Sequence, residues 1–176
     1  MKKLFLLLVA AATMMFASCG DGSKSSYQAP VTLDELDDYF TVKSYKLQTD
    51  VKEKGLDHLG DAKGTLVLVL KRNNEEMKLK PSDIDYAYLE GAAVASDYYV
   101  FEADIEGIVR KLLKVEPGSE ETIEIPIKIQ DPYKQHKSDE ENQKNRQAHY
   151  DALMGVKGAL EEIYFNIELK GEDDDY

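Results

Sequence analysis

Apolar and polar positions alternate along several short stretches of this chain, which is the pattern of half-buried β-strands. The clearest stretch is 122–129, where four isoleucines occupy one face and polar residues or proline occupy the other. Pro126 has no backbone N–H, so we expect this strand to lie at a sheet edge or beside a gap in pairing. Similar alternation predicts further strands over 39–49, 84–88, 99–105 and 165–169, and more weakly over 76–80.

Two of the stretches carry additional information. Residues 65–70 (TLVLVL) are almost uniformly apolar, which predicts a central strand that is buried on both faces. Within 39–49 the apolar positions change parity, since Val42 and Tyr45 belong to opposite faces of a regular strand. We therefore predict a β-bulge near Lys43 and Ser44.

Helix signals are fewer and more local. Ser138 followed by Glu141 forms a capping box, and the helix that it begins is expected to extend to about Leu160. A single helical turn is predicted after Thr32, with that residue as its N-cap. The apolar spacing over 105–115 fits a helix, but a glycine within it and the Pro-Gly turn that follows leave the choice between helix and strand open.

About seven strands and one late helix predict a mainly β fold, and an immunoglobulin-like two-layer β-sandwich fits this best. The stretch 113–126 (LKVEPGSEETIEIP) resembles the turn and strand of immunoglobulin-like and telokin-like domains. The helix after Ser138 is not part of that resemblance. It supports the alternative of an α+β fold in which one helix packs on an antiparallel sheet.

Residues 1–18 have the form of a secretion signal, with two lysines, an uncharged apolar stretch and small residues at the end. The apolar stretch is shorter than the roughly 20 residues that a membrane-spanning helix needs. The only cysteine of the chain, Cys19, follows directly. Its thiol is the one group here that can form a thioether with a diacylglyceryl group.

The segment 16–20 (FASCG) resembles the lipobox of bacterial lipoproteins, including those of Bacteroides-like bacteria. Phe16 stands where the commonest lipoboxes have leucine. The resemblance implies that Cys19 becomes the first residue of the mature protein and carries acyl chains such as palmitate. Gly20, in place of an aspartate, implies an outer-membrane location, with the periplasmic and the outward-facing orientation both open.

These features divide the chain into four parts. Residues 1–18 are the signal peptide, and 19–30 form the lipidated cysteine and a polar, flexible tether. Residues 31–170 are expected to form a single β-sandwich domain. An acidic tail, 171–176, completes the chain.

Charge limits the partners that the protein can have. The full chain has a formal net charge of −12, and loss of Lys2 and Lys3 with the signal peptide brings it to −14. Nucleic acids and anionic lipid surfaces select basic faces, so we expect no nucleic-acid partner and no docking on lipid through a basic patch. A single cysteine also excludes disulfides within the chain and cysteine-rich zinc sites.

Tyrosines are the strongest candidates for a binding site. The chain has eleven tyrosines and no tryptophan. A face lined by tyrosines can stack on sugar rings or contact an envelope protein, although it can also be an ordinary half-buried sheet face. The candidates lie in two neighbouring predicted strands and are Tyr86, Tyr88, Tyr98 and Tyr99.

Catalytic and metal-binding motifs are absent from the sequence, so no catalytic residue, metal or cofactor is predicted. His58, His136 and His149 belong to no metal-binding motif and are expected on solvated loops or helix surface. The acidic groups at 34–38 and 173–175 could offer oxygen ligands to calcium but match no EF-hand, and they are expected to be solvated. The leading hypothesis is a non-catalytic binding domain on a membrane-anchored lipoprotein. The alternatives are a structural or assembly lipoprotein of an envelope complex and, less favoured, a hydrolase with dispersed acidic residues.

Overall fold

A computed structural model of the chain describes residues 29–132 and 138–171. Cys19 with its leader, His136 and the tail from residue 172 lie outside the described residues. No helix in the described ranges has the length and apolar character to cross a bilayer. The strands are β1 (Val31–Thr32), β2 (Phe40–Thr49), β3 (Lys63–Arg72), β4 (Ile84–Ala93), β5 (Tyr99–Asp104), β6 (Glu120–Ile129) and β7 (Leu160–Leu169). The helices are η1 (Asp34–Leu36), α1 (Val51–Lys54), η2 (Leu56–Asp61), α2 (Glu106–Leu112) and α3 (Asp139–Leu153).

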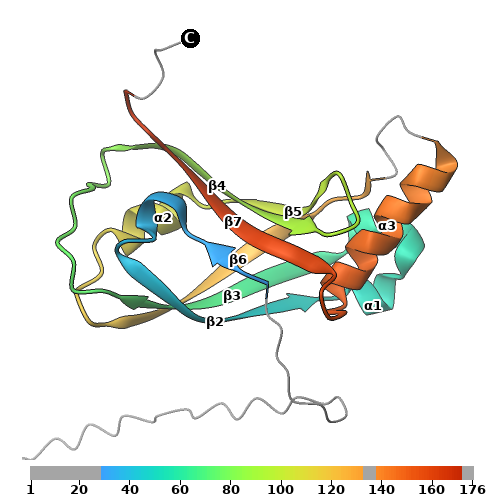
Figure 1. The fold of residues 1–176 in the computed structure, drawn as a ribbon, viewed down its shortest axis with the longest axis horizontal. Helices are drawn as coiled ribbons and strands as arrows, with labels where there is room; N and C mark the ends of the chain where they lie inside the picture. Colours follow the sequence, from blue (N-terminus) through green and yellow to red (C-terminus); the bar gives the residue numbers. More distant parts are fainter. Residues whose placement is uncertain (1–28, 133–137, 172–176) are drawn as a thin grey trace, which may run out of the picture.

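All seven strands belong to one mixed sheet with the order β1-β7-β4-β5-β6-β3-β2. Only the β1–β7 pair is parallel. The sheet curves until it is nearly barrel-shaped, with α3 and α1 at one end and α2 at the other (Figure 1). The predicted mainly β class is therefore confirmed, whereas the immunoglobulin-like two-layer sandwich is not, because the strands pair into a single sheet.

One side chain bridges the two edge strands of the sheet. Tyr45 of β2 accepts a hydrogen bond at 2.9 Å from the backbone N–H of Ala29, just before β1. Further along β7, where β1 has ended, the carboxylate of Asp34 accepts a hydrogen bond from the N–H of Ile167 at 2.8 Å. Tyr45 thus links the two edges of the sheet, and Asp34 satisfies an N–H of β7 that a longer β1 would have bonded.

The core lies inside the curved sheet and is built from one face of each strand. On β3, Leu66, Leu68 and Leu70 are fully buried, while Val67 and Val69 between them are only half-buried. The prediction that 65–70 is buried on both faces is therefore wrong, since its outer face has no second layer over it. The apolar outer valines are compatible with a strand that has a neighbour on either side.

Two predictions about strand irregularities are confirmed. The register of β2 against β3 shifts between Val42 and Ser44, which is the predicted bulge. β6 pairs with β3 along its length, but its described pairing with β5 is limited to Lys128 and Ile129. Pro126 therefore lies beside the gap in pairing that its missing N–H predicted.

The chain between β5 and β6 is helical, which resolves the choice left open for 105–115. α2 directs Val109 and Leu112 into the core, following the helical spacing of its apolar residues. The weak strand predicted over 76–80 does not form. The seventh strand is instead β1, whose two residues are too few to give an alternating pattern.

α3 begins where the sequence predicts and ends earlier. The Ser138 side chain accepts a hydrogen bond from the N–H of Glu141, and the Glu141 carboxylate accepts one from the N–H of Ser138, so the capping box is complete. The helix ends at Leu153 rather than near Leu160, because Gly155 takes a left-handed conformation (φ 74°) that ends the helix. Thr32 is no N-cap, since it belongs to β1.

Candidate functional site: a tyrosine–carboxylate face

Tyrosines and carboxylates alternate with core residues on β4, β5 and β7 and so share the outer face of the sheet. Register places Tyr88 of β4 between Asn166 of β7 and Asp104 of β5, and Glu90 between Tyr164 and Glu102. A register shift between Ile84 and Tyr86 lets Ile84 enter the core while Tyr86 stays outside. We call this surface the tyrosine–carboxylate face; its members are Tyr86, Tyr88, Glu90, Tyr99, Glu102, Asp104, Glu162, Tyr164, Asn166 and Glu168.

Contacts within the face hold its central side chains in place. The rings of Tyr86 and Tyr88 lie 5.2 Å apart between centroids at an interplanar angle of 42°. Asn166 donates a hydrogen bond to the Tyr88 hydroxyl, and Tyr99 forms a hydrogen bond with the carboxylate of Glu90. These contacts span three adjacent strands, so they limit the rotamers of aromatic groups that are otherwise open to solvent.

The electrostatics of the face are dominated by negative charge. Partial burial raises the pKa of Glu90, and the neighbouring Glu102 raises it further. The charge of Glu90 is the largest cause that raises the pKa of the Tyr99 phenol. Partial burial, followed by the charge of Glu90, raises the pKa of the Tyr88 phenol. The parts of these shifts that come from Glu90 and Glu102 report repulsion between negative charges, which a bound cation would reduce.

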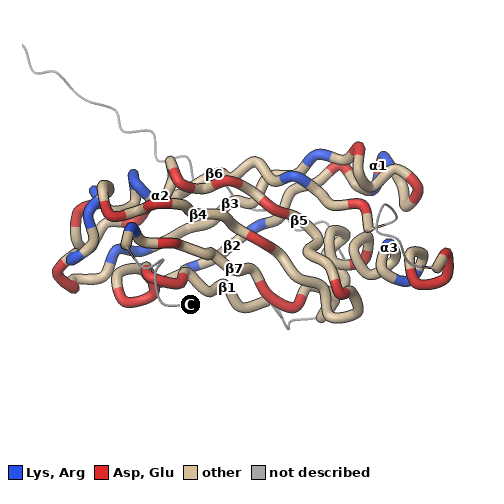
Figure 2. The backbone as a smooth tube through the Cα atoms, turned by 90° about the horizontal axis from the view of Figure 1, so that it is seen from above, with Lys and Arg blue, Asp and Glu red and all other residues tan. Residues whose placement is uncertain are grey.

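A shallow hollow of about 570 Å³ lies on this face. Its lining includes two tyrosine rings and four carboxylates but neither lysine nor arginine: Tyr86, Tyr88, Glu90, Glu102, Ala103, Asp104 and Glu168. The nearest ion pair that the structure gives to this lining joins Glu102 to Lys128 of β6 at 2.8 Å. The hollow can therefore hold a flat or cationic group against aromatic rings with carboxylates around it. Acidic positions also recur along the neighbouring strands (Figure 2).

The structure brings together three of the four tyrosines that the sequence singled out. Tyr86 and Tyr99 are 46% and 50% exposed, and Tyr88 is half-buried between them. Tyr98 lies outside the face, in the β4–β5 turn, where its carbonyl is 3.3 Å from the His149 imidazole. Sequence reasoning missed Glu90 and Tyr164, because only the register of β7 against β4 shows that they are neighbours.

A serine–histidine pair lies elsewhere, between the β4–β5 turn and α3. His149 Nε2 is 2.9 Å from the Ser96 hydroxyl, and His149 Nδ1 is 3.1 Å from the carbonyl oxygen of Gln130. The nearby carboxylate of Asp131 instead accepts three hydrogen bonds from the guanidinium of Arg146, at 2.8 to 3.1 Å. The imidazole is fully buried, which corrects the prediction that His149 is solvated. The imidazole is enclosed, and the carbonyl of Gln130 fixes its orientation. We therefore interpret the Ser96–His149 pair as a structural link between α3 and the sheet.

This burial predicts a pH dependence of stability. Burial lowers the pKa of His149 below 6.5, so the unfolded chain takes up a proton near neutral pH more readily than the folded chain does. Stability should therefore fall as the pH decreases from 7.5 to 5.5, by about 1 kcal/mol from this residue. Urea unfolding at the two pH values measures the difference in the free energy of unfolding.

The variant His149→Gln should be less stable overall and should lose most of that difference. His58→Gln is the matched control, because the His58 side chain is 67% exposed. If His149→Gln kept the full pH dependence of the wild type, the buried imidazole would not be its source.

Two residues of the acidic group at 34–38 accept hydrogen bonds from backbone N–H groups. Besides Asp34, which binds the N–H of Ile167, Asp37 accepts a hydrogen bond from the N–H of Leu33 at 3.0 Å. Among the residues that the structure describes, no group of three or more His, Cys, Asp and Glu side chains is placed to hold a metal ion. The acidic group at 173–175 lies outside them.

Comparisons with known proteins give no family for this chain, since no protein-family model, curated protein or solved structure matches it. In the described residues, the tyrosine–carboxylate face combines a pair of aromatic rings, negative charge and a hollow whose lining has no lysine or arginine. A second hollow beside Tyr39 is also acidic, but Lys78 belongs to its lining.

Proposed function

We propose that the protein is a non-catalytic binding lipoprotein, held in the outer membrane through acylated Cys19, whose domain binds a basic segment of another envelope protein. The anchor is supported by the lipobox-like sequence around Cys19. The binding role is carried by one observation, the hollow that is lined by two tyrosines and four carboxylates without a basic residue. The periplasmic and surface-facing orientations are both compatible with this proposal.

A lysine or arginine side chain suits the hollow in two ways. A cation over the face of a tyrosine ring is attracted by the ring quadrupole, and a guanidinium can also pair with carboxylates in bidentate geometry. Glu90 should be stabilised most by such a partner, because it is partly buried beside Glu102. Its side-chain partner is the neutral Tyr99 hydroxyl, and no cation pairs with it in the described structure. A bound cation would relieve the repulsion from Glu102, which adds to the effect of burial on the pKa of Glu90.

A neutral glycan is the less favoured ligand. Sugar rings could stack on Tyr86 or Tyr99, which are both half exposed. Sugar hydroxyls would leave the net charge of the hollow unchanged, however, and Glu90 would still have no cationic partner in the described structure. A basic protein segment can contact both the tyrosine rings and the carboxylates of the hollow. Such a segment could belong to a transient partner or to a stable envelope complex.

We expect a hexa-arginine peptide to bind the full-length protein in isothermal titration calorimetry, and to bind more weakly as salt is raised. The double variant Tyr86→Ser with Glu168→Gln should weaken binding about fivefold, since it removes one ring and one ion-pair partner worth roughly 1 kcal/mol together. Both side chains are exposed, so we expect the fold to be retained.

The control variant Glu124→Gln removes the same charge from an exposed position of β6 outside the hollow. It should bind hexa-arginine within about twofold of the wild type. The proposal would be contradicted by an equal loss of affinity in both variants. If the protein bound maltohexaose and did not bind hexa-arginine, the ligand would be a neutral glycan instead.

A further inference from the structure

Exposed apolar side chains gather at one end of the curved sheet. Of the five large hydrophobic residues that are exposed in the described ranges, Tyr86 and Tyr99 belong to the tyrosine–carboxylate face. The other three, which we call the apolar end, are Val94 (61% exposed), Met154 (39%) and Val156 (52%). Met154 and Val156 follow α3, and the N–H of Val94 donates to the carbonyl of Ala159 in the same turn at 3.1 Å.

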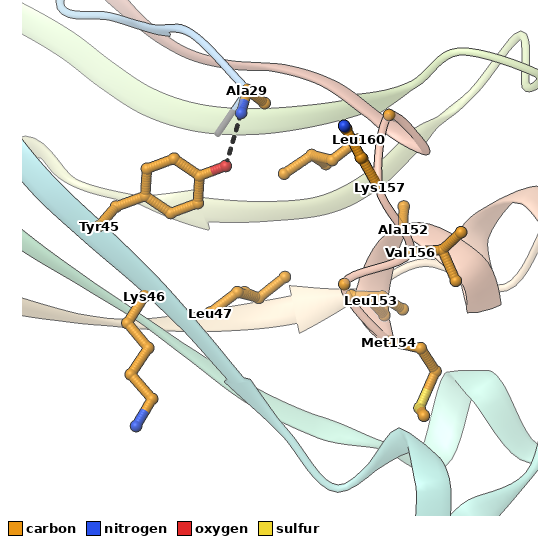
Figure 3. A pocket seen from close by; sticks show the side chains of 12 residues that line it. Ala29, Tyr45, Lys46, Leu47, Ala152, Leu153, Met154, Val156, Lys157 and Leu160 are labelled. Atoms are coloured by element: carbon orange, nitrogen blue, oxygen red, sulfur yellow. Dashed lines mark hydrogen bonds between the residues drawn. The ribbon is translucent and has the colours of Figure 1, made fainter. Parts of the chain in front are cut away.

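Two residues of the apolar end, Met154 and Val156, line a cavity of about 200 Å³ between β2 and the turn from α3 to β7. Leu47, Leu153 and Leu160 line its inner part, and Met154 and Val156 lie toward its rim (Figure 3). Tyr45 closes one side through its bond to Ala29. Met154 and Val156 therefore lie beside the buried Leu153 and Leu160 at one cavity and are not scattered singly.

The tether from Cys19 enters the domain at this same place. Ala29, the first described residue, lines the cavity together with Met154 and Val156. Cys19 is ten residues earlier, so a fully extended chain between them spans at most about 35 Å. An acyl group on Cys19 would therefore keep Ala29, and the cavity that it lines, within about 35 Å of the anchor point in the bilayer.

The turn from α3 to β7 has fewer acidic residues than the rest of the molecule. Residues 154–160 (MGVKGAL) contain no acidic residue, although the chain has 34 acids in 176 residues. Lys46 and Lys157 lie at the cavity (Figure 3). Acidic surface is repelled by anionic lipid, so this turn can approach headgroups more closely than the acidic positions of α1, α3 and the start of β7 beside it.

From these observations we infer that the apolar end rests on the bilayer that holds the anchor, an inference that depends on the proposed acylation of Cys19. Val94, Met154 and Val156 enter the headgroup region, and the lysines stay at the level of the phosphates. The contact is too small to hold the protein on a membrane alone. It becomes effective because the short tether keeps it at high local concentration beside the bilayer.

The single native cysteine allows a direct test. Acylation consumes the Cys19 thiol, so the variant Val156→Cys has one free thiol, which is labelled with a nitroxide. The acylated full-length protein is reconstituted in vesicles of phosphatidylethanolamine and phosphatidylglycerol. Collision of the nitroxide with oxygen, which concentrates in lipid, is compared with collision with a water-soluble nickel chelate. The control variant is Glu116→Cys, at an exposed position in the turn between α2 and β6, at the other end of the sheet.

We expect the oxygen-to-nickel ratio to be severalfold higher at position 156 than at position 116. Equal, water-like ratios in protein whose mass shows the acyl chains would overturn the inference and leave the anchor intact. A mass without acyl chains, with two free thiols in Val156→Cys, would overturn the anchor and the inference together. If Val156→Cys fails to fold, Met154→Cys is labelled in the same way and judged by the same ratio.

Discussion

Replacing Arg72 with leucine is expected to lower the free energy of unfolding by about 3 kcal/mol or more, because it leaves three partly buried backbone carbonyls without their donor. Arg72 ends β3 and is only 2% exposed. Its guanidinium donates to the carbonyls of Tyr39 and Asn73 at 3.0 and 2.9 Å, and to that of Glu75 at 2.6 Å. It also packs against the rings of Tyr39 and Phe40. One side chain thus fixes the start of β2 and the segment that leaves β3.

Two further substitutions isolate the role of the guanidinium. Arg72→Lys keeps the charge but replaces the planar fork of donors, so it should also be strongly destabilising. Lys71→Met, at the exposed neighbouring position on β3, should change stability by no more than about 0.5 kcal/mol. The measurement is urea unfolding followed by circular dichroism. Stability of Arg72→Leu close to that of the wild type would show that these three carbonyls find other donors.

Gly91→Ala should cost about 1–3 kcal/mol through overpacking. Gly91 lies on β4 directly opposite Phe101 of β5, and both are buried. A Cβ at Gly91 would meet the Phe101 ring far closer than any real Cβ contact. The ring is fully buried in the core, so it cannot turn aside without moving its neighbours.

Gly107→Ala is the matched control for this substitution. Gly107 lies in α2, is exposed, and has nothing within 4 Å of an added Cβ. Alanine there should raise stability by about 0.5–1 kcal/mol, because glycine is a poor helix former. Thermal unfolding should therefore move in opposite directions for the two variants. A loss of stability in both, or in neither, would contradict the close approach of Phe101 to Gly91.

Local patterns in the sequence predicted the elements whose causes are local. The bulge at Val42–Ser44, the capping box at Ser138 and the pairing gap beside Pro126 all follow from the chemistry of a few consecutive residues, and the structure has all three. The order of the strands was not accessible in this way. It depends on pairings between distant segments, such as β1 with β7, so alternation alone could not distinguish one curved sheet from a two-layer sandwich.

The same distinction applies to the candidate site and to α3. Tyr86, Tyr88 and Tyr99 were predicted together because they lie in strands that follow one another, whereas Tyr164 reaches the face only through the register of β7. His149 was misplaced because α3 buries polar residues, among them Asn142, Asn145 and His149, and a hydrophobic pattern cannot show such a face. The early end of α3 could have been recognised from Gly155 and Gly158, which both have positive φ in the structure.

An NMR titration of the ¹⁵N-labelled full-length protein with hexa-arginine locates the binding surface residue by residue. If the tyrosine–carboxylate face binds the peptide, the perturbed backbone amides lie on β4, β5 and β7 around Tyr88, Glu90 and Asn166, and the amide signals of β2, α1 and α3 stay in place. Perturbations spread over acidic positions throughout the molecule, or concentrated away from these three strands, would show that the tyrosine–carboxylate face is not the binding site.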